Sequence, residues 1–137
     1  MIRKALIYLA GPFSHTEKAI MNEREIQHAK CAIALKQQGL SIYAPITETT
    51  ALEKLGGLKE TSWAYWREHD LNLLSRCDEL WVMLLDGYKE SLGVKGEVKF
   101  AVKNSIPIKF VAIDGSYTLI KDILKEFDVK TIEELND

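Results

Sequence analysis

The 137-residue sequence predicts an α/β fold, and two observations support this prediction. Short apolar segments, which end at turn-forming residues, alternate along the chain with longer segments of helical spacing. Strands that alternate with helices pair in parallel through right-handed crossovers. We therefore expect a three-layer sandwich around a central parallel sheet of four to five strands, of the flavodoxin or Rossmann type.

The first expected strand is Lys4 to Ala10, which is apolar on both faces and therefore suits a central position in the sheet. It stops at Gly11-Pro12. A helix is expected from Glu17 to Gln38, because this segment is rich in Ala, Glu, Lys and Gln and Gly39 follows it. The apolar positions on one face of this helix are Ala19, Ile26, Ala29 and Ile33.

The second expected strand is Leu40 to Ile46, ended by Pro45. A polar, glycine-containing segment follows from Thr47 to Thr61, which is long enough for a lid or substrate loop and could contain a short helix. Ser62 can cap the next helix. The apolar positions that recur in that helix are Trp63, Trp66, Leu73, Leu74 and Cys77.

The second half of the chain continues the alternation of strands and helices. A strand is expected at Glu79 to Leu85 and a loop at Asp86 to Glu90. Ser91 can cap the helix that follows, and Ile106 to Ile113 is the fourth expected strand. The tail beyond it is expected to form one or two amphipathic helices. The inner face of the helix after Ser91 is expected to hold Val94, Val98, Ala101 and Val102.

Size and composition indicate one soluble domain across residues 1–137. The hydrophobic share of 47% and the charged share of 28% are ordinary, and no apolar run is long enough for a membrane span. Ile2 to Ala10 is too short for a secretory signal, so we expect a cytoplasmic protein. A net charge of -2 without a basic stripe argues against nucleic-acid binding, although local donors could hold one small anion.

The sequence predicts no metal and no cofactor. Cys31 and Cys77 lack CxxC spacing and are expected to be buried, reduced thiols. The histidines show no metal-ligand spacing with the cysteines or with one another. Neither a GxGxxG nor a GxxxxGK[ST] motif is present, which argues against a dinucleotide cofactor and against P-loop chemistry. The three histidines are His15, His28 and His69.

In this fold class, ligands bind at the carboxyl ends of the strands, near a switch in strand order. The turns after the first and third strands are expected to face one another there. The first turn offers backbone donors, a hydroxyl and an imidazole, which suit a phosphate or a 5′-hydroxyl. Ser91 could add a phosphate donor at a helix N-terminus or could only cap the helix. The residues of the first turn are Gly11, Pro12, Phe13, Ser14 and His15.

Glu97 is the leading candidate for a catalytic carboxylate. It is expected about two turns into its helix, at the edge of the inward face, where its side chain would point into a partly dry pocket. Gly93 and Gly96 flank it and leave room for a ligand to approach the helix. The alternative is an exposed glutamate that pairs with a neighbouring lysine.

Two aspartates and two tryptophans are further candidates. Asp70 falls on the apolar stripe of its helix, where it either pairs with Arg67 or another basic residue or acts as a pocket acid that holds a sugar hydroxyl or a base. Asp86 directly follows the third strand, at the ligand edge, but could simply form a turn. Trp63 and Trp66 could stack on a base, although large aromatic residues at helical spacing usually belong to a core.

Three segments resemble the nucleoside 2-deoxyribosyltransferase superfamily, which includes the 2′-deoxynucleoside 5′-monophosphate N-glycosidases. They are YLAGPFSH, HDLNLLSRCDELWVMLLDG, and SLGVKGEVKFAV followed by IPI. The resemblance implies that Glu97 is the nucleophile and that Asp70 and Asp86 correspond to the two aspartates of the family. It also implies a substrate turn made of Tyr8 and residues 11–15, and a homo-oligomer, a dimer or larger.

The resemblance implies cleavage of the N-glycosidic bond of a nucleoside or a nucleoside 5′-monophosphate, by hydrolysis or by base exchange. Departure of a base builds oxocarbenium character at C1′, which a carboxylate can stabilise and then capture. Pro12, Phe13 and His15 stand where the monophosphate hydrolases carry an arginine and several glycines, so a 5′-phosphate requirement stays open. Two alternatives also stay open: a non-catalytic nucleotide sensor, and a glycohydrolase of a larger nucleotide such as NAD.

Overall fold

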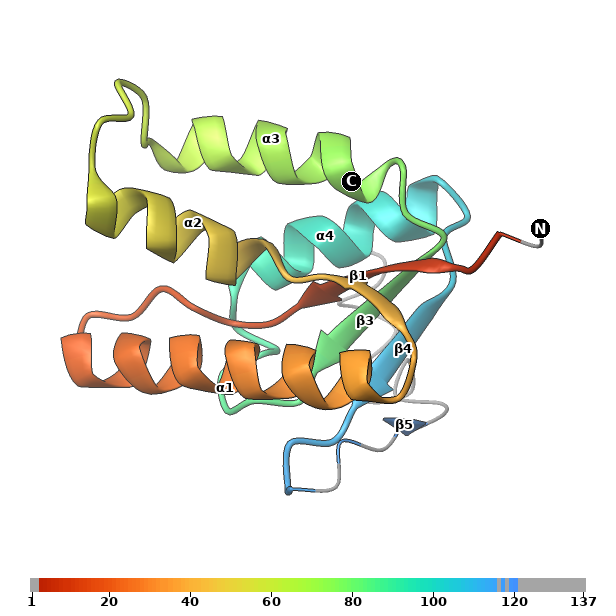
Figure 1. Ribbon diagram of the computed structural model, residues 1–137. Helices are drawn as coiled ribbons and strands as arrows, with labels where there is room; N and C mark the ends of the chain where they lie inside the picture. Colours follow the sequence, from red (N-terminus) through yellow and green to blue (C-terminus); the bar gives the residue numbers. More distant parts are fainter. Residues whose placement is uncertain (1–2, 116, 118, 121–137) are drawn as a thin grey trace.

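The computed structural model describes residues 3–115, 117 and 119–120. A central sheet is built from strands that alternate with helices, as the sequence predicts (Figure 1). In chain order the elements are β1 (Leu6–Ala10), α1 (Lys18–Gln37), β2 (Ser41–Tyr43), α2 (Pro45–Leu55), α3 (Trp63–Leu74), β3 (Glu79–Met83), α4 (Leu92–Lys103), β4 (Ile108–Val111) and β5 (Leu119–Ile120).

The strand order is β2-β1-β3-β4-β5, in which β1 to β4 are parallel and β5 runs antiparallel to β4. The α/β fold class is therefore confirmed, with four parallel strands. The connection after β1 leads to α1 on one face of the sheet, and the connection after β3 leads to α4 on the other face (Figure 1). The boundary between β1 and β3 is thus the switch point at which ligands bind in this architecture.

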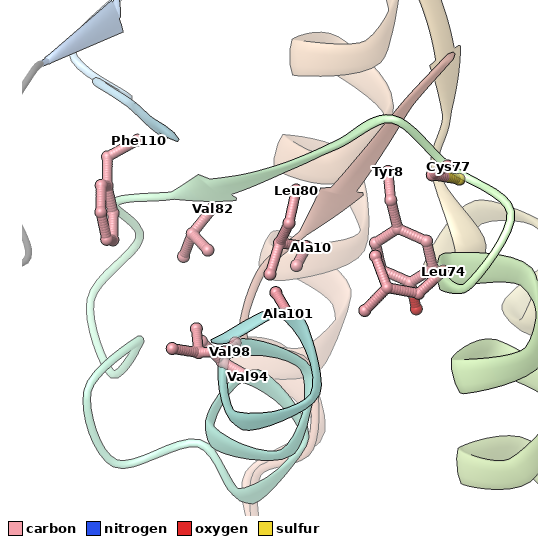
Figure 2. Close-up of a cluster of buried hydrophobic side chains, with 10 residues drawn as sticks. All are labelled: Tyr8, Ala10, Leu74, Cys77, Leu80, Val82, Val94, Val98, Ala101 and Phe110. Carbon is pink, nitrogen blue, oxygen red and sulfur yellow. The ribbon is translucent and has the colours of Figure 1, made fainter. Parts of the chain in front are cut away.

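Alternating side chains of the central strands build one hydrophobic core on each face of the sheet, which explains why these strands are apolar throughout. On the α1 side, the strand residues of the core include Ile7, Leu9, Trp81 and Met83. On the other face, strand residues pack against Leu74 of α3 and against α4, as Figure 2 shows. Those strand residues include Tyr8, Ala10, Leu80, Val82 and Phe110.

The face that α1 buries differs from the predicted one. The helix buries His28, Cys31, Ala32 and Leu35. Of the apolar positions predicted to share a face, Ala19 is exposed and Ala29 is only partly buried. Ile26 and Ile33 are 46% and 57% exposed. Apolar side chains of this alanine-rich helix occur on most of its faces, so its sequence does not specify which face turns inward. Packing against the sheet selects the buried face.

The expected long loop from Thr47 to Thr61 is mostly helix. Pro45 does end the second strand, but it also occupies the first turn of α2, where its missing N–H costs nothing and its fixed φ suits a helix. Gly56, with φ of 86°, ends this helix. The connection to α3 is therefore confined to residues 56–62, and α2 becomes available as a wall of the site.

Both cysteines are free and buried, as predicted. Cys77 lies beyond the end of α3 at Leu74, however, and is not part of the helix. The described part of the tail forms the short strand β5, which was not predicted, and the rest of the predicted tail helices lies outside the described residues. Among the helices that are described, none combines the length and apolarity that crossing a bilayer requires. The single domain, the cytoplasmic location and the homo-oligomer stay predictions.

Candidate functional site

A cavity of about 540 Å³ lies at the carboxyl end of β1, between α2, α3 and α4. This volume is within the range of small-molecule pockets. Its position at the switch point is the one expected from the sequence. The predicted site residues that line the cavity are Gly11, Phe13, Ser14, Asp70, Ser91, Gly93 and Glu97.

Four predicted site residues are not part of the cavity lining. The Tyr8 side chain is fully buried in the core of the α4 side. Pro12 is buried and its carbonyl oxygen lies 3.2 Å from Nε2 of His28, while Nδ1 of His15 accepts a 2.9 Å hydrogen bond from the backbone N–H of Glu17. Asp86 is exposed. The structure thus places Gly11, Phe13 and Ser14, rather than the whole first turn, at the cavity.

Glu97 lies in the second turn of α4 and is partly buried at the cavity wall. Burial, together with the nearby negative charge of Asp70, raises the pKa of its carboxyl group to about 8, although the Tyr8 hydroxyl acts in the opposite direction. A carboxyl group with this pKa holds its proton in much of the free protein at neutral pH. It is therefore not the solvated, lysine-paired glutamate that was the alternative.

The Tyr8 hydroxyl lies beside the Glu97 carboxyl group and contributes to its electrostatics. Burial and the charges of Glu97 and Asp70 raise the pKa of Tyr8 well above its usual range, so the phenol stays neutral. Within the described residues the hydroxyl has no partner in hydrogen-bonding geometry. A neutral donor that is buried and unpaired beside a carboxyl group can stabilise the ionised form after a small movement.

Asp70 lies on α3 and faces the same cavity, and its side chain is only 17% exposed. Its Oδ1 atom is 3.1 Å from Nδ1 of His69, so among the basic residues that could pair with it the partner is the adjacent histidine and not Arg67. Burial raises the pKa of Asp70, and the interaction with His69 opposes the shift. The site thus contains two partly buried carboxyl groups, which is a common arrangement for acid–base and nucleophilic chemistry.

Trp63 and Trp66 line the cavity and do not belong to either hydrophobic core. Trp63 is 55% exposed, and the Arg67 guanidinium lies 5.2 Å from the centre of its ring. Nε1 of Trp66 donates a 2.8 Å hydrogen bond to Glu53 of α2. The expectation that these tryptophans belong to the core is therefore wrong, and both are available to contact a ligand.

The segment predicted as a lid or substrate loop that could contain a short helix lines the cavity through one face of α2, and this helical face was not predicted. Pro45, Thr49 and Glu53 line the cavity and are spaced four residues apart, so they lie on one face of the helix. The four-residue spacing is present in the sequence, but it places the three side chains on one face only if the segment is a helix. Reading Pro45 as the first residue of a helix, rather than only as the end of a strand, would have found this face.

Ser91 caps α4, since its Oγ atom accepts a 3.2 Å hydrogen bond from the backbone N–H of Val94. The predicted cap is confirmed, and Ser91 also lines the cavity together with Gly93 and Gly96. The described part of the chain contains no group of three or more His, Cys, Asp or Glu side chains placed to hold a metal ion.

Because His28 is buried, the free energy of unfolding is expected to fall in acid. Burial lowers its pKa to about 4 from 6.5, so the unfolded chain binds a proton that the folded protein excludes when the pH falls from 6.5 towards 4. Between pH 7 and pH 5 the wild type is expected to lose about 2 kcal/mol more than a His28→Gln protein. Urea unfolding of both proteins at both pH values measures this difference, and equal losses would contradict the burial of a neutral imidazole.

Comparison with known proteins agrees with this architecture. A solved structure of a 2-deoxyribosyltransferase from the psychrotolerant bacterium Bacillus psychrosaccharolyticus matches with a TM-score of 0.58 and 19% identity, over 88% of this chain and 79% of that chain. This likeness confirms the fold that the sequence resemblance implies. No curated protein matches the chain. Residues 5–113 match the model of a family described as a domain of unknown function, DUF1937. The chain therefore belongs to the DUF1937 family.

Proposed function

We propose that the protein cleaves the N-glycosidic bond of a nucleoside or a nucleoside 5′-monophosphate, with Glu97 as the nucleophile. The observation that supports this most directly is the pair of partly buried carboxyl groups, Glu97 and Asp70, at one cavity beside the neutral Tyr8 phenol. The similarity of the fold to a 2-deoxyribosyltransferase is in line with this chemistry.

In the proposed first step, a carboxylate oxygen of Glu97 attacks C1′ of the sugar as the bond from C1′ to the base breaks. The base leaves with the bonding electron pair and takes up a proton, and the sugar remains as an ester of Glu97. Asp70 accepts a hydrogen bond from a sugar hydroxyl and holds C1′ near the nucleophile. The Tyr8 hydroxyl stabilises the Glu97 carboxylate before the attack.

In the second step, water or a second base attacks C1′ and the ester bond to Glu97 breaks, which restores the carboxylate. Attack by water releases the free sugar and a proton, whereas attack by a base forms a new nucleoside. Whether the protein is a hydrolase or a transferase depends on which acceptor reaches the intermediate. Trp63 lines the cavity and is 55% exposed, so it is a place where an acceptor could reach the intermediate.

The purified protein should be incubated with a panel of nucleosides, their 5′-monophosphates and NAD, with and without an added acceptor base. We expect chromatography to show free base from at least one nucleoside or monophosphate. Binding of a nucleoside without release of base would contradict the proposal and favour a nucleotide sensor. Release of nicotinamide from NAD alone would instead favour a glycohydrolase of larger nucleotides.

Substitution of Asp70 is expected to reduce activity, whereas substitution of Asp86 is expected to have little effect. An Asp70→Asn protein is expected to lose about 10- to 100-fold in kcat/KM, because a neutral amide holds a sugar hydroxyl less firmly than a carboxylate does. Asp86 does not line the cavity and is exposed, so Asp86→Asn is expected to change kcat/KM by less than about threefold. Equal losses in both variants, measured with the substrate found in the panel, would contradict the assignment of Asp70.

A further inference from the structure

We propose that Arg24 is a positioning residue, which holds the two turns at the switch point in the arrangement that the cavity needs. Arg24 lies on α1, is partly buried and does not line the cavity, so it would act on a ligand only through these turns. The effect on turnover rests on the proposed function. The bridge between the turns can be tested independently of any activity.

The guanidinium group of Arg24 connects the turn after β1 to the turn after β3. Its Nη1 atom donates to the carbonyl oxygens of Ser14, at 2.9 Å, and Phe13, at 3.4 Å. Its Nη2 atom donates to the carbonyl oxygen of Asp86, at 3.1 Å. Asp86 is 62 residues from Arg24 in the sequence and Ser14 is 10 residues from it on the other side, and one planar cation bridges the two turns because its N–H groups form a rigid fork.

The backbone of the second turn is shaped around this cation. Gly87 has φ of +93°, and a Cβ atom at this position would lie 2.5 Å from Nη2 of Arg24. A side chain there would therefore be strained by the backbone conformation and would also collide with the guanidinium. The turn after β3 thus needs a glycine at the point where Arg24 approaches it.

His28, one helical turn after Arg24, holds the first turn from the same side. Its ring is fully buried, and its Nε2 atom is 3.2 Å from the carbonyl oxygen of Pro12. Because its pKa is lowered to about 4, the ring is neutral, and Nε2 can donate to this carbonyl. Arg24 and His28 together contact three consecutive carbonyl oxygens, those of Pro12, Phe13 and Ser14.

These contacts matter for the site because the turns held by Arg24 lead directly into the cavity wall. Phe13 and Ser14 line the cavity, and the second turn leads to Ser91 at the start of α4. A shift of either turn would move the cavity wall relative to Glu97 on α4. Small misplacements of this kind can reduce turnover by about a hundredfold.

The test compares Arg24→Ala and Arg24→Lys with Lys30→Ala, which removes an exposed lysine from the same helix. We expect Arg24→Ala to lower kcat/KM about 10- to 100-fold. Arg24→Lys keeps the charge but not the fork, so it should be impaired to a lesser extent. Lys30→Ala should match the wild type. Backbone hydrogen exchange should become faster in Arg24→Ala at both turns, residues 13–15 and 86–91.

Chemical rescue distinguishes the contribution of the N–H donors of the guanidinium group from the contribution of its charge. Guanidinium chloride at about 20 mM should restore part of the activity of Arg24→Ala, because the free cation can occupy the vacated space and donate to the same carbonyls. Tetramethylammonium chloride at the same concentration carries the charge without donors and should restore nothing. Equal rescue by both salts would overturn the role of the fork.

The hydrogen-exchange measurement tests whether Arg24 holds the two turns together even if the protein turns over no substrate. Absence of turnover in the wild type would count against the proposed function only. Unchanged exchange at the two turns, or faster exchange at only one of them, would overturn the bridge whether or not the wild type is active. If Arg24→Ala unfolds as a whole, the same comparison is made with Arg24→Lys, in which loosening of both turns is again expected and its absence overturns the bridge.

Discussion

A Glu97→Gln protein is expected to lose a factor of roughly a thousand or more in turnover, because an amide cannot form the covalent sugar intermediate. Glutamine keeps the size and most of the hydrogen-bonding capacity of the protonated glutamic acid, so the cavity should still bind the substrate. Release of free base, measured by chromatography in parallel with calorimetric binding, would show loss of catalysis with retention of affinity.

The matched control for this variant is Glu68→Gln, which removes an exposed glutamate from α3. This control should retain wild-type turnover. Full turnover by Glu97→Gln would remove Glu97 as the nucleophile and with it the proposed mechanism. Equal losses in both variants would point to a general dependence on negative charge rather than to covalent chemistry.

The same substitution is expected to stabilise the protein in base, which shows that lost activity does not result from unfolding. The pKa of Glu97 is about 8 in the folded protein against 4.5 as the ordinary value, so the folded state retains a proton that the unfolded chain releases between these pH values. Wild-type stability therefore falls as the pH rises through this window. At pH 9 Glu97→Gln should be more stable by on the order of 5 kcal/mol, and at pH 4 this advantage should disappear.

The second large effect is a steep dependence of activity on pH. A nucleophilic carboxylate must be ionised, and the pKa of Glu97 in the free protein is about 8. We therefore expect kcat/KM to rise about tenfold per pH unit up to about pH 8 and then to level off. Measurement of kcat/KM from pH 5 to pH 9.5 gives this rising limb of the pH profile. A plateau that already begins near pH 5 would mean that the nucleophile is ionised well below the expected pH.

Two substitutions should move this limb in opposite directions. The Tyr8 hydroxyl lowers the pKa of Glu97, so Tyr8→Phe should shift the limb to higher pH. The charge of Asp70 raises the pKa of Glu97, so Asp70→Asn should shift the limb to lower pH, in addition to its loss of rate. Shifts in the same direction would show that the limb does not report Glu97.

Much of the fold was predictable because its signals are local. An apolar segment ended by Gly11-Pro12 predicted β1, an apolar segment before the loop at Asp86 predicted β3, and the cap of α4 at Ser91 was read directly from the sequence. The inward face of α1 was not predictable, because apolar residues occur around most of that helix. The role of Pro45 was only half predicted, since the same residue can end a strand and begin a helix.

The candidate site shows the same division. Trp63 and Trp66 have the helical spacing of core residues, and nothing local shows that they line the cavity instead. The reason is geometric, since the first turns of α3 extend past the end of the sheet, where no strand lies beneath them (Figure 1). The sequence did not indicate the role of Arg24. Its three partners are backbone carbonyl oxygens, which do not depend on residue type.

The sequence by itself determined the alternation of the four parallel strands with helices and the candidates Glu97 and Asp70, because periodicity, turn residues and local motifs are properties of neighbouring residues. Only the tertiary structure decided which candidates share a cavity, that Asp86 stays outside its lining, and that Arg24 joins the two turns. Burial and proximity set the pKa of Glu97, and both depend on side chains that the crossovers of the sheet bring together from distant parts of the chain.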